Sequence, residues 1–239
     1  MADSKKFAFY LKVYFMLNFK LLIWDFDGVI VDSEKVWLKN RVDFFHQHLG
    51  VDWDFEFVNL NFGGTSDSTK KIILDKMGYK TNDRFWNDVL KLDVATMDKH
   101  GLEVFDGALD ILTRTNIKQC IATGGVRTKT LHKIKVAGIQ KFIKPENVFT
   151  IDNVSRGKPE PDLFLYAAEK MGELPQNCVV IEDSLAGMTA GLRAGMTVIA
   201  FLGSQMYQNK TYIEKVKKIG VSYICFDMSE VKHILFDKD

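Results

Sequence analysis

The chain has 239 residues, which allows one large domain or a core with a substantial insertion, because a domain averages about 150 residues. Hydrophobic residues make up 46% of the sequence and charged residues 26%, a composition that excludes a disordered, collagen-like or disulfide-stapled chain. The 32 basic and 31 acidic side chains leave a formal net charge of +1, so no broad charged face for nucleic acid is expected.

Residues 1–16 precede the first regular pattern and form an N-terminal extension. Lys5-Lys6 and the apolar residues after them resemble a secretory signal only superficially, because Lys12 interrupts the run and no small-residue cleavage site follows. The run is also too short to cross a bilayer, which takes about 20 residues. Three alternatives stay open for residues 1–16: a short packing helix, a frayed tail, or sequence upstream of a true start at Met16.

Three cysteines, Cys120, Cys178 and Cys225, lie far apart within apolar runs. We interpret them as reduced core residues, which indicates a cytoplasmic protein. We expect neither nucleic acid nor membrane as a partner, and a monomer or weak dimer.

Short apolar runs that end in a polar residue recur along the chain. Such runs predict buried parallel strands, because helices that cover both faces of a sheet remove the alternation of polar and apolar residues. The runs are 21–24, 120–123, 178–182, 197–201 and 223–226. Helical patterns lie between them at about 107–115, 127–137, 161–171, 185–193, 210–219 and 229–236. The alternation predicts an α/β fold with a doubly wound parallel sheet.

The connection after the first strand is too long for this scheme. Positions 28 to 122, which are 95 residues, separate Asp27 from Thr123, whereas a strand-helix-strand unit takes about 30. The interval contains no convincing strand and at least three helical patterns, near 34–48, 65–77 and 82–99. We therefore predict an all-helical domain at 34–104, inserted into a core made of 17–33 and 105–239.

Polar residues close several of the predicted strands. They are Asp25 and Asp27 after the first strand, Thr123 and Gly124 after the second, and Glu182 and Asp183 after a later one, with Lys158 between the last two. Each has a simpler interpretation alone: a solvated turn, a core hydroxyl or a surface lysine. Because ligands bind beyond the carboxyl ends of parallel strands, and these ends share one edge, we expect the residues to form one site.

Carboxylates gathered at one edge need a cation, since unit charges about 4 Å apart repel by about 4 kcal/mol at an effective dielectric of 20. The candidate ligands are oxygen atoms without His or Cys, which favours Mg²⁺. Neighbouring side chains on a strand point in opposite directions, so we assign Asp183 to the metal and Glu182 to a contact through a bridging water. With Lys158 and the Thr123 hydroxyl, the metal would cradle a phosphate.

The motif from Asp25 to Ser33, followed by Thr123, Lys158-Pro159 and Glu182-Asp183-Ser184, closely resembles the four ordered motifs of the haloacid dehalogenase-like hydrolases. The helical insertion resembles the cap of the branch that contains phosphoglycolate phosphatase, β-phosphoglucomutase and sugar-phosphate phosphatases. The resemblance implies a Rossmann-like core and a phosphoric monoester hydrolase.

The resemblance also implies a role for each matched residue. Asp25 is the nucleophile that becomes an aspartyl phosphate, and Asp27 protonates the leaving oxygen and then activates water. Thr123, Gly124 and Lys158 bind the phosphate. The metal is held by Asp25, Asp183, Glu182 and the backbone carbonyl of Asp27.

Within this family, the expected function is a Mg²⁺-dependent phosphatase of a small phosphorylated metabolite of the sugar phosphate, phosphoglycolate or phosphogluconate type. In the mutase branch, a Gly-x-Ser-Arg motif of the cap holds a second phosphate. Its match here, from Gly64 and Thr65, puts Asp67 at the arginine position, where an anion would repel that phosphate. A phosphomutase and a non-catalytic phosphate-binding or partner-binding protein remain as alternatives.

Overall fold

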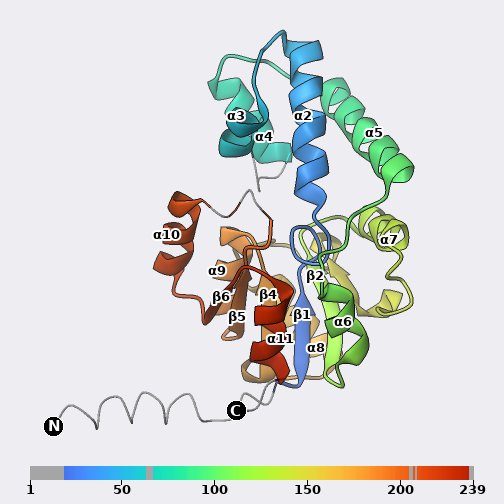
Figure 1. The fold of residues 1–239 in the computed structure, drawn as a ribbon, viewed down its shortest axis with the longest axis vertical. Helices are drawn as coiled ribbons and strands as arrows, with labels where there is room; N and C mark the ends of the chain where they lie inside the picture. Colours follow the sequence, from blue (N-terminus) through green and yellow to red (C-terminus); the bar gives the residue numbers. More distant parts are fainter. Residues whose placement is uncertain (1–18, 63–66, 205–206, 208, 237–239) are drawn as a thin grey trace, which may run out of the picture.

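The computed structural model describes residues 19–62, 67–204, 207 and 209–236, and the N-terminal extension 1–16 lies outside them. Six parallel strands form one sheet with β1 near its middle, in the order β3-β2-β1-β4-β5-β6 (Figure 1). This order confirms the predicted doubly wound fold. Strands β2 and β3 are added on one side of β1 and strands β4 to β6 on the other, and a crevice forms where the order switches. The strands are β1 (Leu21–Trp24), β2 (Lys118–Thr123), β3 (Val148–Thr150), β4 (Cys178–Glu182), β5 (Thr197–Phe201) and β6 (Tyr223–Cys225).

Helices cover both faces of the sheet, as the unbroken apolar strands predict. Leu21 and Ile23 of β1 face one hydrophobic layer, and Leu22 and Trp24 face the other. The first layer is completed by α8 (Asp162–Met171), α9 (Leu185–Arg193) and α10 (Lys210–Ile219). The second is completed by α6 (Ala108–Arg114), α7 (Arg127–Val136) and α11 (Met228–Phe236). All six helices match the predicted patterns to within one residue at each end.

Two elements were not predicted. The strand β3 has three residues, too few for a periodic signal, and it exists because Ile121, Ala122 and Thr123 of β2 supply its partners. The helix α3 (Phe55–Phe62) is eight residues long and mostly apolar, so its sequence does not separate a helix from a strand.

Four helices lie together beyond the carboxyl ends of the strands (Figure 1). They are α2 (Ser33–Leu49), α3, α4 (Asp67–Lys76) and α5 (Asp83–His100). The chain enters and leaves this group through adjacent segments. The amide of Asp32 donates to the carbonyl of Glu103 at 2.9 Å, and the amide of Phe105 donates to the carbonyl of Ile30 at 3.0 Å. Between β1 and β2, the described residues contain no strand, in accord with the predicted all-helical insertion.

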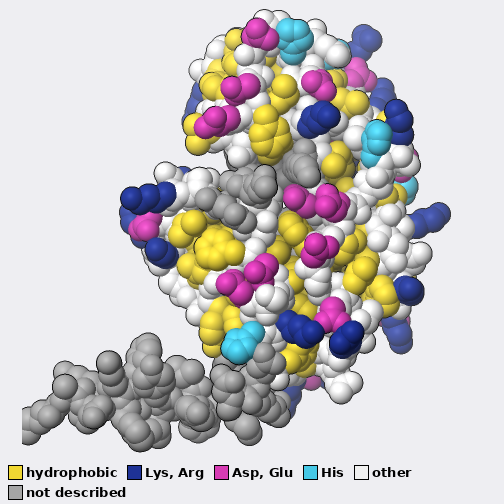
Figure 2. Space-filling model, viewed as in Figure 1, with side chains coloured by type: hydrophobic (Ala, Val, Ile, Leu, Met, Phe, Trp, Pro, Cys, Tyr) yellow, Lys and Arg dark blue, Asp and Glu magenta, His cyan; other side chains and the backbone are white. Residues whose placement is uncertain are grey.

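Acidic and basic side chains are interspersed on the face of the molecule that Figure 2 shows, in keeping with the balanced charge of the sequence. No helix within the described part of the chain has the length and apolar character that a membrane span requires. Cys120, Cys178 and Cys225 are buried and unpaired by disulfides, as predicted.

A buried ion pair joins α2 to α5. The guanidinium of Arg41, 3% exposed, donates to both carboxylate oxygens of Asp93 at 2.6 and 2.7 Å, and the amide of Asn40 donates to the same carboxylate at 3.0 Å. Aromatic rings pack on the same helices: Phe45 is fully buried and lies 5.3 Å from Phe62, centroid to centroid. The inserted helices are therefore held to one another by buried aromatic packing and by an ion pair.

We predict that Arg41→Met lowers the free energy of unfolding by about 3 kcal/mol, because it leaves the Asp93 carboxylate buried without its guanidinium. The double variant Arg41→Met/Asp93→Leu should be more stable than the single variant, since it removes both charges. Urea unfolding of the three proteins measures this. A single variant as stable as the wild type would show that the ion pair contributes nothing to this packing.

Candidate active site

The carboxyl end of β1 places Asp25 at the crevice of the sheet. Its amide continues the strand ladder by donating to the carbonyl of Ile181 on β4 at 3.0 Å, and its side chain is 6% exposed. The strand β1 pairs with β2 on one side and β4 on the other, which brings the residues closing these three strands to one edge. The predicted meeting of Asp25, Thr123 and Glu182 follows from this register.

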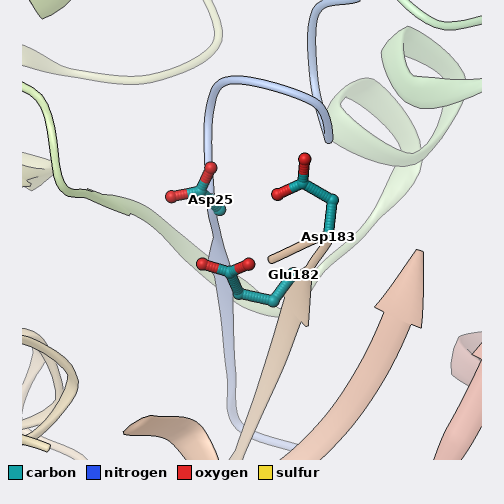
Figure 3. Close-up of side chains that lie close together, drawn as sticks. All are labelled: Asp25, Glu182 and Asp183. Atoms are coloured by element: carbon teal, nitrogen blue, oxygen red, sulfur yellow. The ribbon is translucent and has the colours of Figure 1, made fainter. Parts of the chain in front are cut away.

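Three buried carboxylates converge at this edge. The side chains of Asp25 after β1, of Glu182 at the end of β4 and of Asp183, the next residue, lie close together (Figure 3). Each offers one oxygen atom, and these atoms all lie within 4.8 Å of one another. Exposure of the three residues is 6% or less, so water screens their repulsion poorly.

The ammonium of Lys158 lies between two of these carboxylates. Its Nζ donates to Asp25 Oδ1 at 2.6 Å and to Glu182 Oε1 at 2.6 Å. Burial raises the pKa of Asp25 to about 7; Lys158 opposes this rise, and Glu182 adds to it. Burial alone would lower the pKa of Lys158, but Asp25 and Glu182 raise it above its ordinary value. Lys158 is therefore a permanent cation in direct contact with Asp25.

The second oxygen of Glu182 is held by the start of α9. The amide and hydroxyl of Ser184 donate to Glu182 Oε2 at 2.7 and 3.0 Å, and the same hydroxyl caps α9 by accepting from the amide of Gly187 at 3.0 Å. A Cβ atom at Gly187 would lie 1.7 Å from Glu182 Oε1, so a side chain there would displace the carboxylate. Donors of the chain itself thus bind both oxygens of Glu182.

Asp27 is not one of the three converging carboxylates, and its side chain is held by a lysine of α7. Its Oδ1 and Oδ2 accept from the ammonium of Lys133 on α7 at 2.8 and 2.7 Å, and Oδ1 accepts from the hydroxyl of Ser33 at 2.6 Å. Both oxygens of the Asp27 carboxylate are therefore engaged by donors of α7 and of Ser33. The contact with Lys133 was not predicted, because the sequence does not reveal which lysine of α7 faces the crevice.

The three converging carboxylates fit a hard divalent cation. All of their possible metal ligands are oxygen atoms. Balancing three negative charges requires a second positive group beside Lys158. Space for the group depends on Gly28, where a Cβ atom would lie 1.8 Å from Asp183 Oδ2 and where φ is +79°. Asp25 and Asp183, with Glu182 behind them, would hold Mg²⁺.

The predicted phosphate-binding residues lie where expected. Thr123 ends β2, is 3% exposed and accepts a hydrogen bond from the amide of Gly125 at 3.4 Å. Gly124 is exposed at the same edge. Of the predicted cap residues, Gly64 and Thr65 lie outside the described residues; Asp67 begins α4, but its side chain is also outside them.

A cleft of about 370 Å³ adjoins this edge, between α7 and the helices of the insertion. Asp27 and Gly124 line its base, and Trp37 and Met97 line the side formed by α2 and α5. A volume of this size holds a small metabolite. The cleft therefore borders the carboxyl edge of the sheet at Asp27 and Gly124 and is walled by the inserted helices.

Residues 22–201, which are 180 of 239 residues, match the family of haloacid dehalogenase-like hydrolases. The chain belongs to this family. The match confirms the resemblance drawn from the motifs and the predicted enzyme class, a hydrolase related to phosphoric monoester hydrolases.

Two curated relatives come from Escherichia coli K12. One, named 6-phosphogluconate phosphatase, is 28% identical over 187 residues, which are 78% of this chain and 84% of the relative. The other, named hexitol phosphatase A, is 38% identical over 110 residues, which are 45% of this chain and 50% of the relative. A crystal structure of a hydrolase of this family from Deinococcus radiodurans, with bound phosphate and sodium, has a TM-score of 0.76 and 26% identity, covering 92% of this chain and 96% of that one.

We predict that stabilisation by Mg²⁺ depends on pH with a midpoint near 7. Without metal, the raised pKa of Asp25 keeps it protonated below about pH 7, so the cation must displace a proton there, and its affinity falls about tenfold per pH unit. Above pH 7 the carboxylate is already ionised. The increase in melting temperature on adding Mg²⁺ should therefore be larger at pH 8 than at pH 6.

The matched control is Asp25→Asn, whose amide does not titrate, so the difference between the two pH values should shrink. Equal increases at pH 6 and pH 8 in the wild type would contradict the assignment of Asp25 to the cation.

Proposed function

We propose that the chain is a Mg²⁺-dependent phosphatase of small phosphorylated metabolites and that Asp25 is its nucleophile. The observation that carries this is the position of the Asp25 carboxylate, buried at the carboxyl edge of the sheet and held at 2.6 Å by the Lys158 ammonium. A carboxylate in this environment can approach an anionic phosphate, because the charges that would repel it are balanced nearby.

In the proposed first step, one oxygen of Asp25 attacks phosphorus, and the bond from phosphorus to the ester oxygen breaks. Asp27 supplies the proton that the leaving alkoxide takes, so an alcohol departs and an aspartyl phosphate remains. In the second step, Asp27 takes a proton from water, which attacks phosphorus and releases phosphate and free Asp25. One residue thus serves as acid and then as base.

The other residues of the edge bind the group that is transferred. The Lys158 ammonium, the Thr123 hydroxyl and the amide of Gly124 would donate to phosphate oxygens. A cation bound by Asp25, Asp183 and, through water, Glu182 supplies charge neutralisation at phosphorus. Ser184 and Gly187 contribute by fixing the Glu182 carboxylate against Lys158.

We propose that α2 to α5, residues 34–104, act as a cap over a core of 17–33 and 105–239. The helices lie beyond the carboxyl edge, and the cleft between them and α7 would take the leaving group. The segment with Gly64, Thr65 and Asp67 connects two of these helices, and we propose that it contacts substrate and helps to exclude water.

The substrate class we propose is a phosphorylated sugar, sugar acid or glycolate. The names of the two bacterial relatives, a phosphogluconate and a hexitol phosphatase, support this class. The buried, unpaired cysteines support a cytoplasmic location. Both acids of the first motif are present, which favours catalysis over a binding role.

We predict that Asp25→Asn reduces phosphate release at least about a thousandfold, because an amide cannot form the acyl phosphate. Its far-ultraviolet circular dichroism should match that of the wild type. Near-wild-type turnover in a folded variant would reject Asp25 as the nucleophile.

We also predict that a chelator abolishes phosphate release and that added Mg²⁺ restores it, since three crowded carboxylates need the cation. The assay is a phosphate-release screen over sugar phosphates, phosphoglycolate and phosphogluconate. Activity undiminished by chelator would remove the metal from the mechanism. Formation of an isomerised sugar phosphate with little free phosphate would identify a mutase instead.

A further inference from the structure

The cleft has more positive than negative side chains along its wall. Four cationic side chains line it, and two carboxylates do. Both carboxylates already accept from cations of the same wall: Asp93 from Arg41 on the insertion, and Asp27 from Lys133 on α7. The proposed position of the transferred phosphate is beside Asp25 and Lys158, which do not line the cleft. The excess of positive charge therefore lies on the part of the cleft that would receive the leaving group.

Two of the four cationic side chains lie on one face of α7. Lys129 and Lys133 are four residues apart, which places them on neighbouring turns of the same helical face, and both line the cleft. Lys129 is exposed and makes no ion pair with any residue that the structure describes. Lys133 is 18% exposed, contacts Asp27 and lies over the ring of Trp37, with 5.4 Å from Nζ to the ring centroid.

The helix α7 also contacts the insertion through His132, the residue before Lys133. His132 Nε2 lies 2.7 Å from Asp98 Oδ1 at the end of α5. The helix α7, which carries both lysines, therefore contacts the insertion through His132 and the segment after β1 through Lys133.

We propose that Lys129 and Lys133 bind a second anionic group of the substrate, so that the chain prefers phosphate esters of hydroxy acids to those of neutral sugars. The inference rests on the proposed phosphatase function and adds a specificity site to it. Lys133 touches Asp27, the proposed acid and base, so it would reach an anion close to the ester oxygen. Lys129, one turn away, would reach the anion of a longer substrate.

A carboxylate and a second phosphate share this chemistry, because an ammonium binds either as a point charge. The test therefore needs three substrates: 6-phosphogluconate, glucose 6-phosphate and a sugar bisphosphate. The first is an open-chain acid and the second a neutral sugar ring, so the lysine variants are needed to assign a preference to the carboxylate. We expect kcat/KM of the wild type to be about tenfold or more higher for 6-phosphogluconate than for glucose 6-phosphate, mainly through KM.

The variant Lys129→Met should lower this ratio of kcat/KM values about tenfold, and Lys129→Arg should restore most of it. The matched control is Lys135→Met, which removes the same charge from an exposed position of α7 that does not line the cleft. It should leave the ratio as in the wild type. A fall of the same size in the control would show a general field effect and overturn the assignment to Lys129.

Binding gives a readout that does not depend on turnover. Calorimetric titration of Asp25→Asn with 6-phosphogluconate and glucose 6-phosphate should show the same preference, and adding Lys129→Met should remove it. Preference for the bisphosphate over both monophosphates, lost in Lys129→Met, would support the site and identify its anion as phosphate.

The two proposals fail in different ways. Hydrolysis of both monophosphates at equal kcat/KM, unchanged by Lys129→Met, would overturn the anion site and leave the phosphatase intact. Absence of phosphate release from every ester tested, including p-nitrophenyl phosphate, together with equal binding of acid and neutral ligands, would overturn both.

Discussion

The contact of the Lys158 ammonium with Asp25 and Glu182 is the interaction on which the rest of the site depends. Three carboxylates with almost no exposure would repel one another strongly without it, and the first of them would stay protonated. Lys158 is 133 positions from Asp25 and reaches it from the loop before α8, whose first residue follows Pro161. The packing of α8 against the sheet therefore also affects the charge of Asp25. Ser184 and Gly187 complete the arrangement by fixing Glu182 from the opposite side.

The sheet could be predicted because burial on both faces leaves a plain trace in the sequence. Runs such as 178–182 are apolar throughout, and the helices between them carry one apolar face. The strand β3 could not be predicted, because its three residues become a strand only through their register with β2. The helix α3 was missed for a related reason: an apolar stretch of eight residues is compatible with either regular structure.

Some residues of the site could be predicted from the sequence and others could not. Asp25, Thr123 and Glu182 were predictable because topology alone brings the ends of neighbouring parallel strands together. Lys133 was not, although it makes two close contacts with Asp27. Its position depends on the rotation of α7 about its own axis and on how the inserted helices lie against it, and the five basic residues among the first nine of that helix give no hint of which one faces inward. Tertiary packing supplies that information.

The paired segments at the neck of the insertion have a further consequence. Backbone hydrogen bonds join Asp32 to Glu103 and Phe105 to Ile30, so the two ends of the insertion lie side by side. The insertion therefore connects to the core as a short hairpin loop would. The entropy of closing such a loop grows only with the logarithm of its length, so helices can be lengthened, lost or exchanged at little expense to the core. The inserted helices can thus change in length or number while the carboxylates at the edge of the sheet keep their positions.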